Sequence, residues 1–278
     1  MASNHTHPFH LVNPSPWPAL ASFALFLLPL GGVLWMHHHM IGVPLVAIGL
    51  SLVLFVMYVW WRDVVREGIH DHAHTPAVRH GLRTGMGLFI CSEVMFFFAF
   101  FFAYFSNAIW PVYTLADFWT VTAGTWPPAG TVTFDPFHLP FMNTLILLLS
   151  GTTVTWAHYA LLENNQKDLK TGLLLTVILG LCFTALQAVE YAHAPFGFKD
   201  GKFASLFFML TGFHGFHVIV GTIFLAVCYF RAKKGQFSEE HHLGFEFAAW
   251  YWHFVDVVWL FLFVFVYWWG GGNVHPGH

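Results

Sequence analysis

Residues 84–106 read TGMGLFICSEVMFFFAFFFAYFS, a stretch with one acidic side chain, Glu93, and no basic one. A helix rises about 1.5 Å per residue, so an apolar run of this length can cross the roughly 30 Å hydrocarbon core of a bilayer. The sequence therefore predicts an all-α membrane protein with seven transmembrane helices. The other six apolar runs are 17–36, 41–61, 141–162, 170–192, 204–230 and 245–269.

The composition agrees with a protein whose main solvent is lipid. Hydrophobic residues make up 57% of the chain and charged residues only 9%, whereas a soluble globular domain carries about 25% charged residues. The cysteines lie inside predicted spans without a Cys-x-x-Cys pair, so they indicate neither a disulfide framework nor a zinc site. Basic residues are few and never alternate with aromatic ones, which excludes a nucleic-acid-binding face.

The 11 basic residues are unevenly divided between the connections. If the N-terminus lies inside, only Lys199 and Lys202 fall on the outer side. The positive-inside rule thus predicts a cytoplasmic (or matrix) N-terminus and an outer C-terminus. The basic residues of the inner side are Arg62, Arg66, Arg79, Arg83, Lys167, Lys170, Arg231, Lys233 and Lys234.

The polar connections predict two parts. The charged connection from Arg62 to Arg83 is the longest inner one, and we expect a boundary there. Residues 1–70 would hold an N-terminal segment and a two-helix arm, and residues 71–278 a five-helix bundle. The connection 108–139 is rich in Trp, Pro, Thr and Gly and is expected to form an ordered outer loop. No matched pair of glycine-broken helices is found, which weighs against a secondary transporter.

An ionised side chain near the bilayer centre costs about 2.5–3.5 kcal/mol and is a functional candidate by default. Glu93 lies deep in its span, roughly 14 Å along the helix axis from Thr84. Either this carboxyl stays protonated, or a partner from another helix or a bound water holds it. A structural, hydrogen-bonded carboxyl and a proton-linked or lipid-linked site both remain open.

Two spans carry polar pairs with the same spacing. His214 and His217 are three residues apart, and His253 and Asp256 repeat the interval in the next span. Residues at this interval share a helix face. Imidazoles in such an arrangement can bind a metal or a haem, or they can form hydrogen bonds between helices. The spacing alone leaves both interpretations open.

Two other motifs match half of a di-iron carboxylate site, which uses a Glu-x-x-His sequence on each of two helices. They are Glu190-x-x-His193 and Glu239-x-x-His242. The predicted topology places them on opposite sides of the membrane, so they cannot form one site.

Seven motifs along the chain resemble those of one known family. In order they are VNPSPWP (12–18), WWRDV (60–64), HTPAV (74–78), SEVMFF (92–97), TWAH (155–158), TGFHGFHV (211–218) and AWYWHFVDVVW (249–259). With these motifs the chain resembles subunit III of the haem–copper cytochrome c oxidases, complex IV, of the mitochondrial and alphaproteobacterial type. The resemblance extends from the first span to the last.

The resemblance implies that the first two helices form a V-shaped cleft against the other five, and that structural phospholipids fill this cleft. It implies no metal, no bound cofactor and no catalytic residue in this chain. His214, His253 and Asp256 would then form structural hydrogen bonds. The lipid-binding residues that it implies are Trp60, Trp61, Arg62, Glu67, His74, Glu93, His217 and Arg231.

The implied role is support of an enzyme complex. Haem a and copper would belong to partner subunits I and II, which reduce dioxygen with electrons from cytochrome c and pump protons. His5, His7 and His10 match the family's histidine-bearing N-terminus, and imidazoles with pKa values of about 6.5 can collect protons. A solvated tail or a docking segment is the alternative for these three.

The location implied is the bacterial inner membrane, with the mitochondrial inner membrane as alternative. Two other functions are considered: the equivalent subunit of a quinol oxidase, and an independent seven-helix transporter or receptor.

Overall fold

A computed structural model describes residues 14–69, 74–109, 126–128 and 130–271. In these ranges all regular structure is helical, and seven helices are long and apolar enough to cross a membrane. The predicted all-α fold with seven membrane-length helices is confirmed. The helices are α1 (Trp17–Met36), α2 (Gly42–Ile69), α3 (Pro76–Ile109), α4 (Leu139–Leu162), α5 (Gln166–Ala192), α6 (Lys202–Lys233) and α7 (Leu243–Leu262), which a π-helix, η1 (Phe263–Trp269), extends.

The helices extend beyond the apolar runs. Most described residues of the predicted Arg62–Arg83 connection are helical, because α2 continues to Ile69 and α3 begins at Pro76. The prediction that this segment is a connection outside the helices is therefore wrong for these residues. Long basic side chains such as Arg66 can extend from the last helical turns toward water, so the helix need not end where the apolar run does.

The chain divides into two compact units, Met1–Leu82 and Arg83–His278, and the division falls within α3. Each unit is described by itself. The V-shaped cleft, and the boundary near residue 70, stay predictions.

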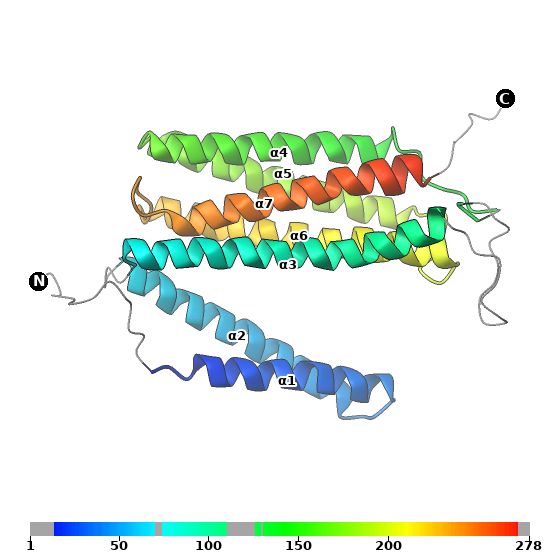
Figure 1. Ribbon diagram of the computed structural model, residues 1–278, viewed down its shortest axis with the longest axis horizontal. Coiled ribbons are helices and arrows are strands. Elements are labelled where there is room, and N and C mark those ends of the chain that lie inside the picture. The colour runs from blue at the N-terminus through cyan, green and yellow to red at the C-terminus, as the bar shows by residue number, and fades with distance from the viewer. Residues whose placement is uncertain (1–13, 70–73, 110–125, 129, 272–278) are drawn as a thin grey trace, which may run out of the picture. The chain divides into compact units, whose positions relative to one another are not determined.

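The first unit is an antiparallel hairpin of α1 and α2 (Figure 1). The end of α1 is a Schellman motif, in which His38 is left-handed (φ 60°) and the N–H groups of His38 and His39 donate to carbonyls of the last turn. A Cβ at Gly31 would lie 2.6 Å from the backbone nitrogen of Val46, so the two helices require glycine to approach this closely. At the open end of the hairpin, Trp17 Nε1–H donates to Asp63 Oδ2 at 2.9 Å.

In the second unit, α4, α5, α6 and α7 form a bundle around a buried core (Figure 1). Small residues let helices approach each other in lipid, and a Cβ at Gly172 of α5 would lie 2.8 Å from the Cβ of Ala157 on α4. Two fully buried tryptophans join α7 to α4. The indole N–H of Trp252 donates to Ser150 at 2.8 Å, and that of Trp259 donates to Thr144 at 2.9 Å.

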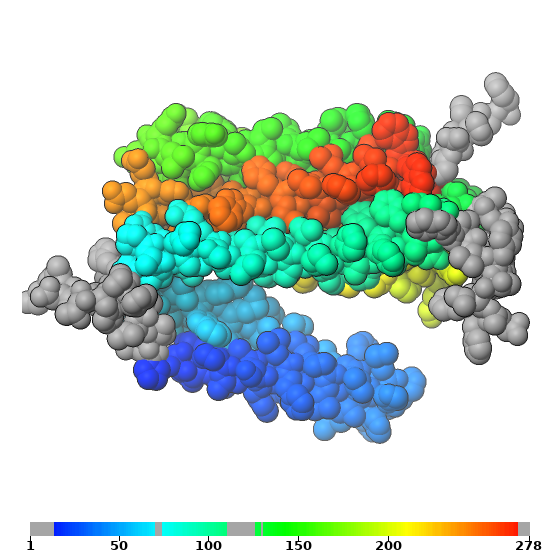
Figure 2. Space-filling view, viewed as in Figure 1, coloured from blue at the N-terminus to red at the C-terminus, as the bar shows by residue number. Residues whose placement is uncertain are grey.

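Helix α3 packs through aromatic rings. Phe97 contacts Phe254 of α7, with a centroid separation of 6.0 Å, and is 2% exposed, whereas its neighbour Phe98 is 58% exposed. Further along the helix, Phe101 contacts Phe261 of α7. Figure 2 shows the side chains of α3 and α7 meeting along this face. The phenylalanine run therefore has one face in the bundle and another toward lipid.

Candidate functional site

Arg231 stands in the last turn of α6, where a Schellman motif reverses the chain. Gly235 supplies the left-handed residue (φ 66°), and the N–H groups of Gly235 and Gln236 donate to the carbonyls of Ala232 and Arg231. This turn folds Gln236 and Phe237 back toward the arginine. As a result Arg231 Nε–H donates to Gln236 Oε1 at 3.2 Å, and the guanidinium carbon lies 4.5 Å from the centre of the Phe237 ring.

The Arg231 guanidinium is half-buried, and it lies beside the first turn of α7. A Cβ placed on Gly244 would meet Arg231 Nη1 at 2.6 Å. The ion pairs found within the described part of the chain do not include Arg231. Its neighbours in the structure, an amide oxygen and an aromatic ring, leave most of its five N–H donors for another acceptor. A planar cation with free donors is well suited to a phosphate.

Glu93 of α3 and His217 of α6 form a pair inside the second unit. His217 Nε2 lies 2.9 Å from Glu93 Oε2, and the side chains are 8% and 22% exposed respectively. The other imidazole nitrogen, Nδ1, lies 2.7 Å from the carbonyl oxygen of Phe213, one turn earlier in α6. The structure thus supplies the partner from another helix that the sequence left open for Glu93.

The protons of this pair follow from its bonds. The Phe213 carbonyl can only accept, so His217 Nδ1 carries a hydrogen and donates it. The contact between Nε2 and Glu93 Oε2 then holds one proton. This proton makes either a neutral carboxyl beside a neutral imidazole or a carboxylate beside an imidazolium, and both forms carry zero net charge in an apolar span.

His214 is directed to a different neighbour. Its Nε2–H donates to the backbone carbonyl of Val255 on α7 at 3.1 Å, and the ring packs against Phe183 and Trp259. The side chain is 1% exposed, and Nδ1 is buried without a partner. His214 is a core residue that contributes one bond between helices.

The pair on α7 faces α4. His253 Nδ1 lies 4.0 Å from Asp256 Oδ2, and His253 Nε2 lies 3.2 Å from Thr155 Oγ1. Asp256 packs over Gly151, where a Cβ would collide with its carboxylate. The two polar pairs of α6 and α7 therefore point to different helices. Within the ranges that the structure describes, no three His, Cys, Asp or Glu residues form a group that could hold a metal ion.

The predicted lipid-binding residues of the first unit lie on or near the second half of α2. Trp60 is 37% exposed and Trp61 is 62% exposed, as interfacial tryptophans usually are. Arg62 Nη2–H donates to Asp63 Oδ1 at 3.0 Å. His74 lies over the last turn of α2, where a Cβ at Gly68 would meet its Nδ1 at 2.8 Å. Glu67 occupies that same turn. His5, His7 and His10 lie outside the described residues.

The sequence reasoning missed one ion pair and the burial of one carboxyl. Arg83, about two turns into α3, makes a bidentate ion pair with Glu246 of α7, with distances of 2.9 Å. Glu190, near the end of α5, is 2% exposed, whereas the sequence had drawn attention to it only through the Glu190-x-x-His193 motif. The sequence did contain a signal for the burial of Glu190, because Glu190 and Gln187 are polar residues inside the apolar run 170–192.

The fold defines a class: a polytopic integral membrane protein whose described interior carries hydrogen-bonded polar pairs. Comparison with known proteins defines the family, because the family model described as Cytochrome c oxidase subunit III matches residues 7–271. The chain belongs to the cytochrome c oxidase subunit III family.

Individual relatives agree over nearly the whole chain. A probable cytochrome c oxidase subunit 3 from Rickettsia felis is 61% identical over 264 residues, which cover 94% of this chain and 95% of the relative. Cytochrome c oxidase subunit 3 from Prototheca wickerhamii is 57% identical, covering 95% and 98%. The protein of the same name from Triticum aestivum is 52% identical, covering 98% and 100%. The chain is thus a subunit of the oxygen-reducing oxidase, complex IV, and assembles with other oxidase subunits in an inner membrane.

Proposed function

We propose that this chain supports oxygen reduction and proton pumping without a redox centre of its own, by holding phospholipid beside the catalytic partners. Those partners would be subunits I and II, which carry haem a and copper and receive electrons from cytochrome c. The inner membrane would be that of a bacterium, with the N-terminus inside. The two-helix arm, residues 1–70, and the bundle, residues 71–278, would each contribute lipid contacts.

The observation that carries the lipid proposal is the guanidinium of Arg231, half-buried without a carboxylate partner among the described residues. A buried cation is costly unless it is paired. Here the end of α6 provides only Gln236 and Phe237. A lipid phosphate would supply the missing charge and accept two parallel N–H bonds.

The remaining predicted residues fit the other parts of a lipid. In the bundle, the Glu93–His217 pair lies among the rings of Phe96, Phe97 and Tyr251. These apolar surroundings suit acyl chains. On the arm, the exposed Trp60, Trp61 and Arg62 suit the ester and phosphate level, with Glu67 and His74 one or more turns further along the chain.

The proton-uptake part of the proposal concerns the N-terminal segment. His5, His7 and His10 would collect protons at the inner face for a partner subunit. This part rests on the family resemblance and on the charge count, and its three residues lie outside those that the structure describes.

The test compares the assembled oxidase carrying Arg231→Ala with the unmodified complex. A hydrogen bond to a charged group contributes about 1.5–3 kcal/mol, so losing the guanidinium should weaken retention of the phosphate-bearing lipid about ten- to hundredfold. Native mass spectrometry measures the bound phospholipid, and steady-state assays measure how many turnovers precede loss of activity. Both should fall, while the initial turnover rate stays close to that of the unmodified complex.

Lys233→Ala is the matched control, because Lys233 is an exposed cation in the same last turn of α6. It should leave lipid content and turnover lifetime unchanged. Arg231→Lys keeps the charge but loses the planar fork, and should fall between the two. Equal lipid content and lifetime in the Arg231→Ala and Lys233→Ala complexes would refute the proposed lipid role.

A further inference from the structure

A buried polar network closes the end of the bundle where α5 finishes. The hydroxyl of Tyr267, on η1, donates to Glu190 Oε1 at 2.6 Å, and Gln187 Nε2–H donates to the same oxygen at 3.1 Å. Asn143 of α4 donates in turn from Nδ2 to Gln187 Oε1 at 3.3 Å. Both donors that reach Glu190 therefore use one carboxyl oxygen, Oε1.

Two acceptors of this network have no donor. Glu190 Oε2 and Asn143 Oδ1 are both buried without a hydrogen-bond partner. The amide orientations are set by the network, because Gln187 must turn its nitrogen toward Glu190 and its oxygen toward Asn143. A buried acceptor without a donor costs about 1–3 kcal/mol. Asn143 Oδ1 therefore lacks a donor, and Glu190 Oε2 lacks a donor when the carboxyl is ionised and an acceptor when it is protonated.

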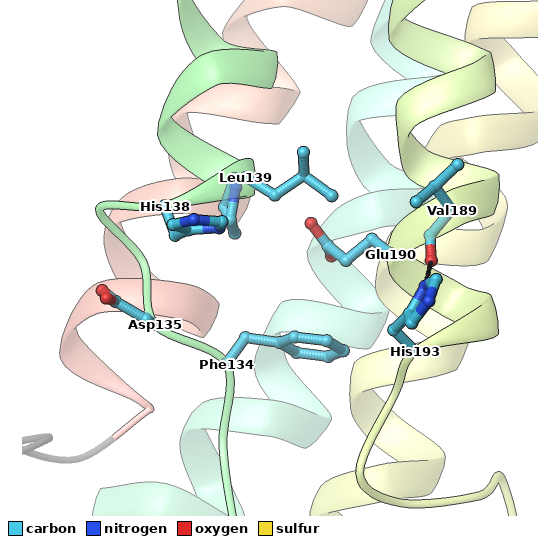
Figure 3. A pocket seen from close by; sticks show the side chains of 8 residues that line it. Phe134, Asp135, His138, Leu139, Val189, Glu190 and His193 are labelled. Carbon is cyan, nitrogen blue, oxygen red and sulfur yellow. Dashed lines mark hydrogen bonds between the residues drawn. The ribbon is translucent and has the colours of Figure 1, made fainter.

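A pocket adjoins this network. Exposed residues, including Asp135 and His138, line it together with the buried Glu190. Figure 3 shows the Glu190 side chain extending from α5 toward the start of α4, where His138 and Leu139 lie. The pocket volume of about 370 Å³ exceeds by far the roughly 30 Å³ that one water molecule occupies. Val189 and His193 of the α5 end are also part of its wall.

We propose that water occupies this pocket and that Glu190 binds and releases a proton through it. A water molecule donates to Oε2 when Glu190 is ionised. When a proton arrives on that water it passes to Oε2, and the new O–H donates back to the same water. The bonds from Tyr267 and Gln187 to Oε1 serve both states, so proton uptake needs no rearrangement of the helices.

Other titratable groups surround this site on each side. Asp135 and His138 precede α4, and the ring of His193, at the end of α5, donates from Nδ1 to the Val189 carbonyl at 2.8 Å. Beside Glu190 on α5, the Tyr191 hydroxyl is bonded to Thr211 of α6 at 2.6 Å. Tyr267 completes the set from η1. The exposed groups of the pocket can exchange protons with bulk water. The hydroxyls of the two tyrosines are bonded to other side chains of the bundle.

Infrared spectroscopy of the assembled oxidase tests this site directly. A protonated carboxyl has a carbonyl stretch that shifts in D₂O and disappears on ionisation. Titration of the unmodified complex should show one such band that Glu190→Gln removes and Glu190→Asp moves. In D₂O this band should exchange quickly, because the pocket brings water to the carboxyl.

A second pair of variants tests the route. Val189→Phe narrows the pocket, and Ile178→Phe places the same ring on the same helix away from it; the two positions are 48% and 46% exposed. The exchange of the Glu190 band should slow several-fold in Val189→Phe and remain unchanged in Ile178→Phe. Equal exchange rates in these two complexes, or a titration in which Glu190→Gln removes no band, would overturn the proposal. If Glu190→Gln prevents assembly, the band is assigned by its shift in Glu190→Asp, and the route comparison is made on that band.

Discussion

At the scale of single residues, the membrane interior makes each polar atom depend on one or two partners. Glu93 illustrates this, because its neighbour His217 is held by the Phe213 carbonyl and can only accept at Nε2 when neutral. The pair is a single unit with one shared proton. Its two members are 124 residues apart in the sequence, so each of them read alone suggests an unpaired group.

The pairing predicts a clear order of stability for two substitutions. Glu93→Gln keeps a donor, the amide N–H, for His217 Nε2 and should assemble with nearly unchanged stability. Glu93→Ala leaves that nitrogen unpaired at low exposure and should cost about 1–3 kcal/mol. Thermal unfolding of the assembled complex measures both, with Ser92→Ala, an exposed neighbour, as control.

The same variants address the proposed lipid contact of Glu93. Glu93→Gln removes the ionisable group while the hydrogen bond to His217 remains, so it should lower the bound phospholipid without lowering assembly. Unchanged lipid content and unchanged turnover lifetime in Glu93→Gln would exclude a role for the carboxyl itself. The expected stability of Glu93→Gln assumes a neutral carboxyl beside a neutral imidazole. A large loss of stability in this variant would show that the pair is a carboxylate beside an imidazolium.

At the scale of helices, two kinds of packing hold the second unit together. Glycine, alanine and threonine allow close approach, as at Gly172 of α5 against Ala157 of α4. Elsewhere a large ring fills the gap, as Trp252 does between α7 and α6. In lipid an apolar side chain gains little free energy by moving from the surface into the bundle. The fit between small residues and large rings therefore largely determines which helix faces pack together.

A matched pair of glycines in α6 tests this packing. A Cβ at Gly221 would lie 2.8 Å from the ring of Trp252, which is fully buried and bonded to Ser150. Overpacking of this kind costs about 1–3 kcal/mol, so Gly221→Ala should lower the unfolding temperature of the complex. At Gly215 a Cβ meets nothing within 4 Å. Gly215→Ala should therefore be neutral or slightly stabilising, and equal effects at both positions would contradict the packing argument.

At the scale of the whole molecule, the sequence predicted the number of helices because bilayer thickness fixes the length of an apolar run. It did not predict which polar groups meet. Helices that are apolar on every side carry no pattern that sets their rotation, so the partner of Glu93 had to come from the structure. The burial of Glu190 was not predicted for a related reason. Its apolar run does not show that Tyr267, 77 residues later, lies against its carboxyl.

The orientation of the molecule in the membrane is the remaining prediction at this scale. Lys167 is an exposed residue in the first turn of α5, and Lys199 is an exposed residue of the connection that follows this helix, whose 27 residues span about 40 Å. Because most basic residues fall on one side, Lys167→Cys should react with a membrane-impermeant maleimide only from the inner side, and Lys199→Cys only from the outer side. Intact spheroplasts and inverted vesicles expose the two faces in turn. The unmodified chain, whose cysteines lie within the spans, is the control. The reverse labelling pattern would place the N-terminus outside and would remove the N-terminal histidines from the proton-uptake face.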